Sequence, residues 1–438
     1  MDAFQLKHVI ESLVSEYKNF ELARSTLDSF EERLTTIEDY EIVSELCKHI
    51  HHHSLRLKCL KFAYTNCVNS EKLSPYRYEL AKTYHFLNEP EKSLFYNDID
   101  YRKDNSNFYA QIERVKFLNA LGRTEEADSL TERMYPQNKQ EKSHLSAFIG
   151  KKQLRNGDLD IGIKNSTLGE RALYAGLVPY KYWTGVKSPG KTIIIHGRGD
   201  ISDQFAYLRF FKQFKELEMQ PVFYSAYVQK RNDILEIYRR HGIESVDNTN
   251  LFTDDFLWVN LSALPGFFQN EEETLWEGPY LTPIRDSKNE LPKFSNLRIG
   301  IKLKSDSVKN NGKIRDIPVK QFFNSLPQNV TVYNFDSEKY DCVNLRDKIT
   351  SWDDTLDYID QMDLIISCDT SLAHAAGAMG KDTIVLAPLD PTYMYVSNRT
   401  DDTTPWYNVN FNVLKQTTLR NWDDPLQEMK ELIDNCVK

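Results

Sequence analysis

The apolar residues of this 438-residue chain change their spacing once, between residues 165 and 190. Before that point they recur at the spacing of one face of an α-helix. Beyond it they gather in short runs, each followed by a stretch with helical spacing, which is typical of buried parallel strands alternating with helices. The pattern therefore predicts a helical part followed by an α/β part.

The helical part repeats itself. Turn-like positions recur at Phe20, Ser54, Asn88, Gly122 and Asn156, each 34 residues after the previous one. The position seven residues before each turn is always apolar: Leu13, Cys47, Ala81, Val115 and Ile149. Helix pairs that cannot bury their own apolar faces stack into a solenoid, with a concave surface suited to a peptide or an adjoining domain. The stretch LNALGRTEEADSL resembles a tetratricopeptide repeat (TPR), so we expect residues 1–170 to form a TPR-like α-solenoid.

The α/β part divides into two halves. The first contains predicted strands at 191–197 and 221–227, separated by a helical stretch from Asp203 to Glu218. The pattern restarts with predicted strands at 297–303, 330–335, 363–368 and 383–388. Alternating strands and helices form open, doubly wound sheets. The expected fold class is α + α/β, in which the solenoid is followed by two Rossmann-like halves at residues 171–295 and 296–438.

The composition of the chain argues against several classes of protein. The chain is 40% apolar and 27% charged, as in a folded globular protein, and its net charge of −9 gives no general attraction to nucleic acid. It has no apolar run near the about 20 residues of a membrane span and no signal-peptide pattern, so we expect no membrane span and a cytoplasmic location. The six cysteines form no CxxC pair, and the run from His49 to His53 lacks a full ligand set. We therefore expect no metal and no other cofactor.

Polar residues follow the predicted strand at 363–368. Asp369, Thr370 and Ser371 precede a small-residue helix that contains Leu372 and His374. Ligands of open α/β sheets sit beyond the carboxyl ends of strands, and the N–H groups at a helix start favour an anion. The alternative is that Asp369 or Ser371 only caps the helix. His374 adds a polar group beyond what a cap needs, which favours an anion site.

A second polar loop, HGRGDIS, follows the first strand of the first half and contains His196, Gly197, Arg198, Gly199 and Asp200. It is not a GxGxxG sequence, so a dinucleotide fingerprint is not supported. Its glycines allow the backbone to approach a ligand, and Asp200 is a candidate general base. A tight turn in which Asp200 caps the next helix remains the alternative.

Basic residues follow the strand at 297–303. They are Lys302, Lys304, Lys309, Lys313 and Arg315. Such a run is usually a solvated loop. Beside an anion-binding helix, however, one or two of these cations could neutralise a phosphate.

Residues 165–410 resemble the heptosyltransferase-like glycosyltransferases of family 9, which have the GT-B fold, here joined to TPR-like repeats. The resemblance rests on segments in family order: YWTGVKSPGKTIIIHGRGD, LSALPGFF, GPYL, LRIGI, IRDIP, DLIISCDTSLAHAAGAMGKDTIVLAP and TPWY. Two segments depart from the pattern. HGRGDIS stands where tetratricopeptide relatives usually have Glu-Gln-Gly-x-Gly-Asp, and GIKLKS replaces a strand end that contains Trp-Gly.

The resemblance implies a reaction and a role for each site residue. The reaction is inverting, metal-independent transfer of a sugar from a nucleotide-sugar donor to an acceptor protein or glycan, which the repeats would recruit. Asp200 would be the base, within an acceptor-side loop of His196, Gly197, Arg198 and Gly199. The residues implied in donor binding are Asp369, Thr370, Ser371, Leu372 and His374, with Arg315 on the pyrophosphate and Lys304 beside it. The alternative is a non-catalytic TPR scaffold whose GT-B part only keeps the fold.

Overall fold

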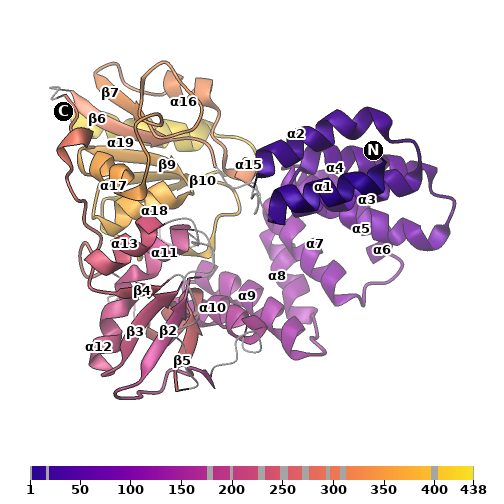
Figure 1. The fold of residues 1–438 in the computed structure, drawn as a ribbon, viewed down its shortest axis with the longest axis horizontal. Coiled ribbons are helices and arrows are strands. Elements are labelled where there is room, and N and C mark those ends of the chain that lie inside the picture. Colours follow the sequence, from indigo (N-terminus) through magenta and orange to yellow (C-terminus); the bar gives the residue numbers. More distant parts are fainter. Residues whose placement is uncertain are drawn as a thin grey trace. The chain divides into compact units, whose positions relative to one another are not determined.

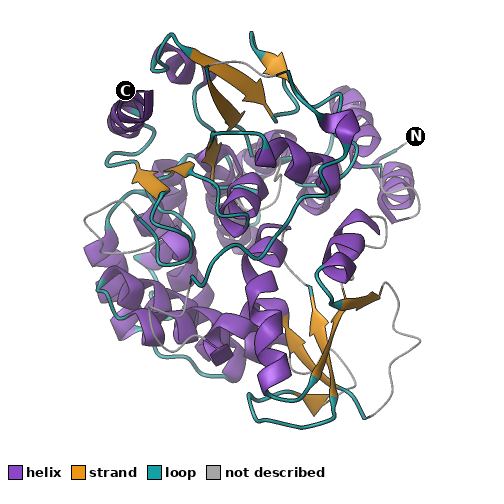
Figure 2. Ribbon diagram, turned by 90° about the vertical axis from the view of Figure 1, so that its left-hand side faces the viewer, coloured by secondary structure: helices purple, strands orange, loops and turns teal. Residues whose placement is uncertain are grey.

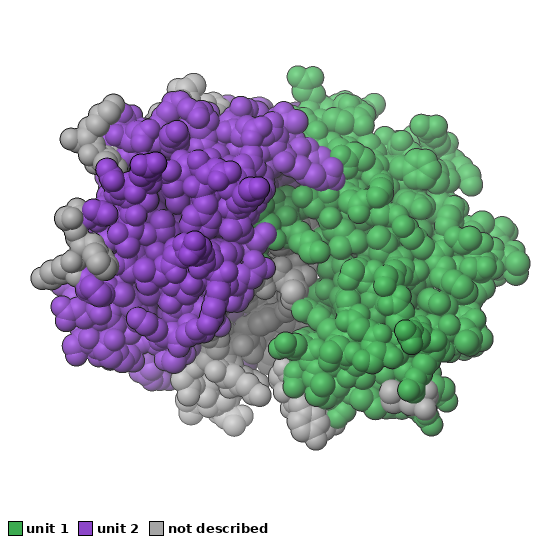
Figure 3. Space-filling view, turned by 90° about the horizontal axis from the view of Figure 1, so that it is seen from above, with its two compact units in different colours: residues 1–134, 305–316 green, residues 135–304, 317–438 purple. Residues whose placement is uncertain are grey.

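The computed structural model describes residues 2–15, 19–174, 181–197, 201–224, 232–246, 255–268, 276–292, 296–305, 312–395 and 403–437. The chain divides into two compact units, coloured separately in Figure 3. Unit 1 comprises residues 1–134 and 305–316, and unit 2 comprises residues 135–304 and 317–438.

Unit 1 is built from helices that pack against their neighbours in the chain (Figure 1). Its helices are α1 (Ala3–Ser15), α2 (Phe20–Phe30), α3 (Ile37–His49), α4 (His53–Asn66), α5 (Ser70–Phe86), α6 (Pro90–Tyr101), α7 (Phe108–Ala120), α8 (Thr124–Arg133) and the short α15 (Gly312–Arg315). Leu6, Leu27 and Cys47 belong to the buried core of the first helices. Of the apolar positions of the repeat, Cys47, Ala81 and Val115 are buried between helices, whereas Leu13 and Ile149 are only partly buried.

The turns within the helix pairs recur with nearly the predicted spacing. Left-handed backbone marks His51, Asn88, Gly122 and Gly157, with φ of 57°, 60°, 72° and 89°. The spacings between these four residues are 37, 34 and 35. The period thus locates the helix pairs, but the second turn is at His51, because Ser54 already lies within α4. The tetratricopeptide superhelix itself remains a prediction.

Unit 2 begins with the last helix pair, α9 (Lys139–Arg155) and α10 (Leu159–Tyr174). The two helices approach closely at Gly150, where an added Cβ would lie 2.4 Å from the backbone N of Ser166. Helix α10 also packs on α14 (Leu264–Phe268). This helix pair is therefore packed directly onto the first α/β half.

The first sheet is parallel and has the order β1-β5-β2-β3-β4. Its elements are β1 (Lys181–Tyr182), β2 (Thr192–His196), α11 (Ile201–Tyr207), α12 (Gln213–Glu216), β3 (Gln220–Tyr224), α13 (Asn232–Arg240), β4 (Glu244–Val246) and β5 (Leu257–Asn260). The helical stretch predicted from Asp203 to Glu218 is present but is not one α-helix, because a 3-10 segment at Leu208–Lys212 separates α11 from α12. Residues 208–211 are all buried, which leaves no solvent-facing side for an amphipathic α-helix there.

The second sheet is also parallel, with the order β11-β10-β9-β6-β7-β8. In Figure 2 the strands of the first sheet lie at the lower right, below those of the second sheet. Its elements are β6 (Leu297–Lys302), α16 (Val319–Asn324), β7 (Val330–Asn334), β8 (Val343–Asn344), α17 (Trp352–Asp360), β9 (Leu364–Cys368), α18 (Ser371–Ala378), β10 (Thr383–Ala387), β11 (Phe411–Lys415) and α19 (Asp423–Val437). Every residue of β9 and β10 is buried. Strands covered on both faces have continuous apolar runs, which is why the sequence predicted these two. The two sheets confirm the two Rossmann-like halves.

Candidate functional site

Each sheet of unit 2 reverses its strand order at one point. In the first sheet the chain runs outward from β2 to β4 and then returns to the other side of β2 as β5. In the second it runs from β6 to β8 and returns beside β6 as β9. Ligands of open α/β sheets bind outside the carboxyl ends of strands at such switch points. The residues that end β2, β5, β6 and β9 therefore define the candidate site.

The switch point of the second sheet carries the start of α18. Thr370 is the N-cap, with extended backbone at φ −145° and ψ 172°, but its side chain does not cap the helix. Its hydroxyl instead pairs with Ser367 Oγ at 2.9 Å. Within the described residues, the N–H groups of Ser371 and Leu372 donate to no protein acceptor. The helix therefore begins with two unused N–H donors rather than with the side-chain cap that the alternative interpretation requires.

His374 lies in the first turns of α18 and is only 3% exposed. Its Nδ1 is 2.7 Å from the Tyr407 hydroxyl, and its Nε2 is 3.3 Å from the Tyr395 hydroxyl. The rings of His374 and Tyr395 stack, with centroids 5.5 Å apart. The Nε2 atom also lies 3.8 Å from Asp369 Oδ1, and Asp369 is 2% exposed. His374 thus contacts Asp369, in the loop between β9 and α18, and is shielded from solvent.

The buried carboxylate of Asp336 holds the backbone at the end of β6 in place. Asp336 is fully buried and accepts hydrogen bonds from the backbone N–H groups of Leu303 at 2.8 Å and Lys304 at 3.2 Å. The Tyr340 hydroxyl donates to the same carboxylate at 3.0 Å, and Lys302 Nζ lies 3.3 Å from it. Because β6 pairs with β9, with Lys302 opposite Ser367, this network fixes the backbone beside the start of α18. Asp336 was not predicted from the sequence, since no local pattern marks it.

The switch point of the first sheet carries His196 and Asn260, which are register partners at the ends of β2 and β5. The His196 ring contacts the rings of Tyr224 and Trp258, with centroids 4.9 and 5.4 Å away. Asn260 is wholly buried, and neither its Oδ1 nor its Nδ2 has a hydrogen-bond partner in the described part of the chain. Asn260 was also missed. Its only sequence signal is a polar residue that directly follows an apolar strand.

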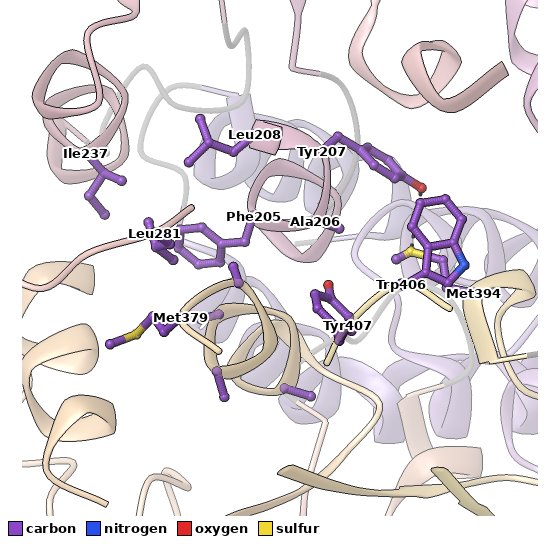
Figure 4. Close-up of a cluster of buried hydrophobic side chains, with 14 of the residues drawn as sticks. Phe205, Ala206, Tyr207, Leu208, Ile237, Leu281, Met379, Met394, Trp406 and Tyr407 are labelled. Carbon is purple, nitrogen blue, oxygen red and sulfur yellow. Dashed lines mark hydrogen bonds between the residues drawn. The ribbon is translucent and has the colours of Figure 1, made fainter. Parts of the chain in front are cut away.

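The helices that follow the two switch-point loops pack against one another. Helix α11 lies along α18, and Figure 4 shows Ala206 above Tyr407, while Tyr207 points toward Trp406 and Met394. In Figure 1 both helices lie between the two sheets. The two halves of unit 2 therefore meet through elements that begin at the candidate site.

The predicted site residues are brought together only in part. Asp369, Thr370, Ser371, Leu372 and His374 share one strand-to-helix turn, with Lys304 just beyond the adjacent strand. His196 and Gly197 end β2 as expected, and Gly197 N–H donates to Tyr224 O at 2.7 Å.

Other predicted residues stay outside this turn. Arg198, Gly199, Asp200 and Lys309 lie outside the described residues. Arg315 ends α15, in unit 1.

In the described ranges, no group of three or more His, Cys, Asp or Glu residues is placed to hold a metal ion. Among the helices described, none combines the length and apolar character needed to cross a bilayer.

Comparison with known proteins gives structural likeness only. No protein-family model and no curated protein matches the chain. A family 9 glycosyl transferase from Veillonella parvula superposes with a TM-score of 0.38 at 8% identity, covering 58% of this chain and 94% of its own. ADP-heptose LPS heptosyltransferase II from E. coli gives 0.35 at 13%, covering 56% and 98%. A mutant O-GlcNAc transferase from Thermobaculum terrenum gives 0.37 at 12%, covering 92% and 95%. Likeness at this level carries no argument about activity.

Proposed function

We propose that this protein is a glycosyltransferase that binds a nucleoside diphosphate sugar at the start of α18 and transfers the sugar to an acceptor. The observation that carries the proposal is the pair of unused N–H groups of Ser371 and Leu372 at the switch point between β6 and β9. A diphosphate suits this place because its oxygens accept backbone N–H bonds, and the helix dipole favours their negative charge.

Transfer breaks the bond between the anomeric carbon and the β-phosphate oxygen, so negative charge grows on the leaving diphosphate. Fixed N–H donors stabilise such charge without a metal, because they need no reorganisation as the charge develops. Lys304 is proposed beside the phosphates, and the bond from its backbone N–H to Asp336 fixes its place at the end of β6. Arg315 is proposed as a pyrophosphate contact on the sequence resemblance alone.

Asp200 is proposed as the general base that removes the acceptor proton, within the loop of His196, Gly197, Arg198 and Gly199. Attack on the face of the anomeric carbon opposite the diphosphate would invert its configuration. The helices of unit 1 are proposed to recruit the acceptor protein or glycan. These assignments rest on the sequence resemblance.

A thermal-shift screen of the full chain against nucleosides, their mono- and diphosphates and nucleotide sugars tests the proposal. We expect stabilisation by one nucleoside diphosphate and its sugars, and little by the free nucleoside. In a donor-hydrolysis or transfer assay, Asp200→Asn should lower turnover by about 10²- to 10⁴-fold with donor affinity retained.

Asp255→Asn is the matched control, because Asp255 is an exposed carboxylate that pairs with Lys191 at the amino end of the first sheet. It should keep full turnover. Wild-type protein that binds no nucleotide would instead favour the scaffold alternative.

A further inference from the structure

Arg209 is a buried cation enclosed by aromatic rings. It follows α11, and its guanidinium lies 4.7 Å from the ring centre of Tyr280, 5.0 Å from that of Tyr407 and 5.8 Å from that of Trp406. Its Nη2 donates to the Tyr280 hydroxyl at 2.8 Å, and its Nη1 donates to Trp406 O at 2.5 Å. Arg209 therefore holds the Tyr280 hydroxyl while its charge lies against the Tyr407 ring.

The Tyr280 hydroxyl is engaged in two directions. It accepts from Arg209 and donates to Ala206 O at 3.2 Å. The Tyr407 hydroxyl is 2.7 Å from His374 Nδ1. Burial raises the pKa of Tyr407 well above its usual value, Tyr280 adds to this, and Arg209 acts in the opposite direction. Tyr407 thus keeps its proton, for which His374 Nδ1 and the Tyr280 hydroxyl are the two neighbouring acceptors, and the bond from Arg209 to Tyr280 favours His374 Nδ1.

The second ring nitrogen of His374 faces oxygen atoms. Its Nε2 lies 3.3 Å from the Tyr395 hydroxyl and 3.8 Å from Asp369 Oδ1. A carboxylate can only accept, so a proton on Nε2 meets acceptors. A proton on Nδ1 would instead force Tyr407 to turn its own proton away from His374. The surroundings of both nitrogens therefore favour the same tautomer.

We propose that Arg209 is a positioning residue that sets the tautomer of His374. By holding the Tyr280 hydroxyl, Arg209 directs the Tyr407 proton to Nδ1 and keeps the histidine proton on Nε2, facing Asp369. Through the contacts that link Arg209 to Tyr280, Tyr407 and His374, the segment that follows α11 fixes the hydrogen bonding of the turn at the start of α18. Any effect of this tautomer on donor binding rests on the function proposed above, whereas the assignment of the tautomer itself does not.

Nitrogen NMR of His374 tests this in the full chain labelled with ¹⁵N-histidine. The protein has 10 histidines, and His374→Gln identifies the signals of interest by their loss. In the wild type we expect one unprotonated and one protonated ring nitrogen, with the proton on Nε2. Arg209→Met keeps the aliphatic bulk between the rings but removes the donors. Tyr407 can then share its proton with Tyr280, so the two His374 signals should move toward each other.

The double variant Arg209→Met/Tyr280→Phe removes the competing hydroxyl, and it should restore the wild-type signals. A purely structural role for Arg209 would not give this reversal. The matched control is Arg114→Met, because Arg114 lies 4.4 Å from the Tyr101 ring centre in unit 1. It should leave the His374 signals unchanged.

Three results would overturn the inference: unchanged His374 signals in Arg209→Met, no reversal in the double variant, or a doubly protonated His374 in the wild type. If Arg209→Met does not fold, Tyr407→Phe decides, since loss of the pure Nε2–H form is expected and its persistence contradicts the inference. The measurement needs no nucleotide. A protein that bound no nucleotide would refute the proposed function and leave this test intact.

Discussion

His241 Nε2 accepts a hydrogen bond of 3.1 Å from the backbone N–H of Thr282. The other ring nitrogen, Nδ1, lies 2.7 Å from Ile237 O, so the ring proton belongs on Nδ1. Thr282 lies in the segment that joins the two α/β halves, where Tyr280 N–H donates to Ala378 O at the end of α18 at 2.9 Å. One neutral histidine thus ties α13 of the first half to the segment resting on α18.

Stability should fall as the pH drops below about 6.5, the usual pKa of an unfolded histidine. Burial lowers the pKa of His241; the hydrogen bond to Ile237 and the charge of Asp353 oppose this, and Arg240 supports it. Between the folded and the unfolded pKa only the unfolded chain binds the proton, so acid favours unfolding. We expect the melting temperature of His241→Gln to vary less than that of the wild type between about pH 7.5 and 5.5. His8→Gln, at an exposed site, is the control, and an unchanged slope in His241→Gln would refute the assignment.

Asp354 should stabilise the joint between the halves above about pH 4, the range of an unfolded aspartate. Burial alone would raise its pKa, but hydrogen bonds from Thr350, Asn289 and Lys288 outweigh burial and hold the pKa well below the usual value. Asp354→Asn should lower the free energy of unfolding by about 1 to 3 kcal/mol at neutral pH.

Because the folded pKa of Asp354 is lowered, its contribution is complete above the unfolded pKa and fades as the pH falls further. The difference between wild type and Asp354→Asn should therefore shrink between about pH 5 and 3 in urea unfolding. A constant difference over that range would show that the carboxylate charge is not responsible. Asp255→Asn, at an exposed site, serves as the control.

Replacing Asn260 with leucine should stabilise the fold. The substitution removes two buried polar atoms without partners in the described structure, and each such atom costs about 1 to 3 kcal/mol. The matched control is Asn334→Leu. Asn334 is equally buried, but it donates to Glu338 O and Asn344 Oδ1 at 2.7 Å and accepts from Asp336 N–H at 2.8 Å. Urea unfolding should show opposite signs for the two variants. A loss in Asn260→Leu like that in Asn334→Leu would mean that ordered water or a ligand satisfies the amide.

Gly377 should not tolerate even a methyl group. An added Cβ would lie 2.6 Å from Tyr407 Cδ1 and 2.8 Å from Phe411 Cε2. Overpacking of this kind costs about 1 to 3 kcal/mol, so Gly377→Ala should unfold at lower urea concentration. An unchanged midpoint would show that the two rings can move aside, and the close packing of α18 would then not depend on glycine.

Local patterns predicted the elements but not the contacts between distant ones. Strand β9 is buried on both faces, and polar residues separate it from α18, so both were visible in the sequence. Strands β1 and β8 have only two residues each, too few to show a period.

Arg209 bonds to Trp406 O across 197 positions, and Asp336 reaches Leu303 across 33. No residue spacing pairs such groups, because only the folded topology brings them together. The candidate turn was therefore predictable, whereas the residues that hold it were not.

The N–H groups at the start of α18 are proposed to bind a nucleoside diphosphate, and Ser371→Pro tests whether they do. Proline suits the first position of a helix and removes that N–H together with the serine hydroxyl, and the extended backbone of Thr370 allows a following proline. The control is Ser70→Pro, at the first position of α5 behind the extended Asn69.

Calorimetric titration of wild type and both variants with the nucleoside diphosphate that stabilises the wild type gives the answer. A lost hydrogen bond to a charged group costs about 1.5 to 3 kcal/mol, so Ser371→Pro should weaken binding at least about tenfold while Ser70→Pro binds like wild type. Equal affinity in wild type and Ser371→Pro would mean that the N–H group at the start of α18 does not hold the diphosphate.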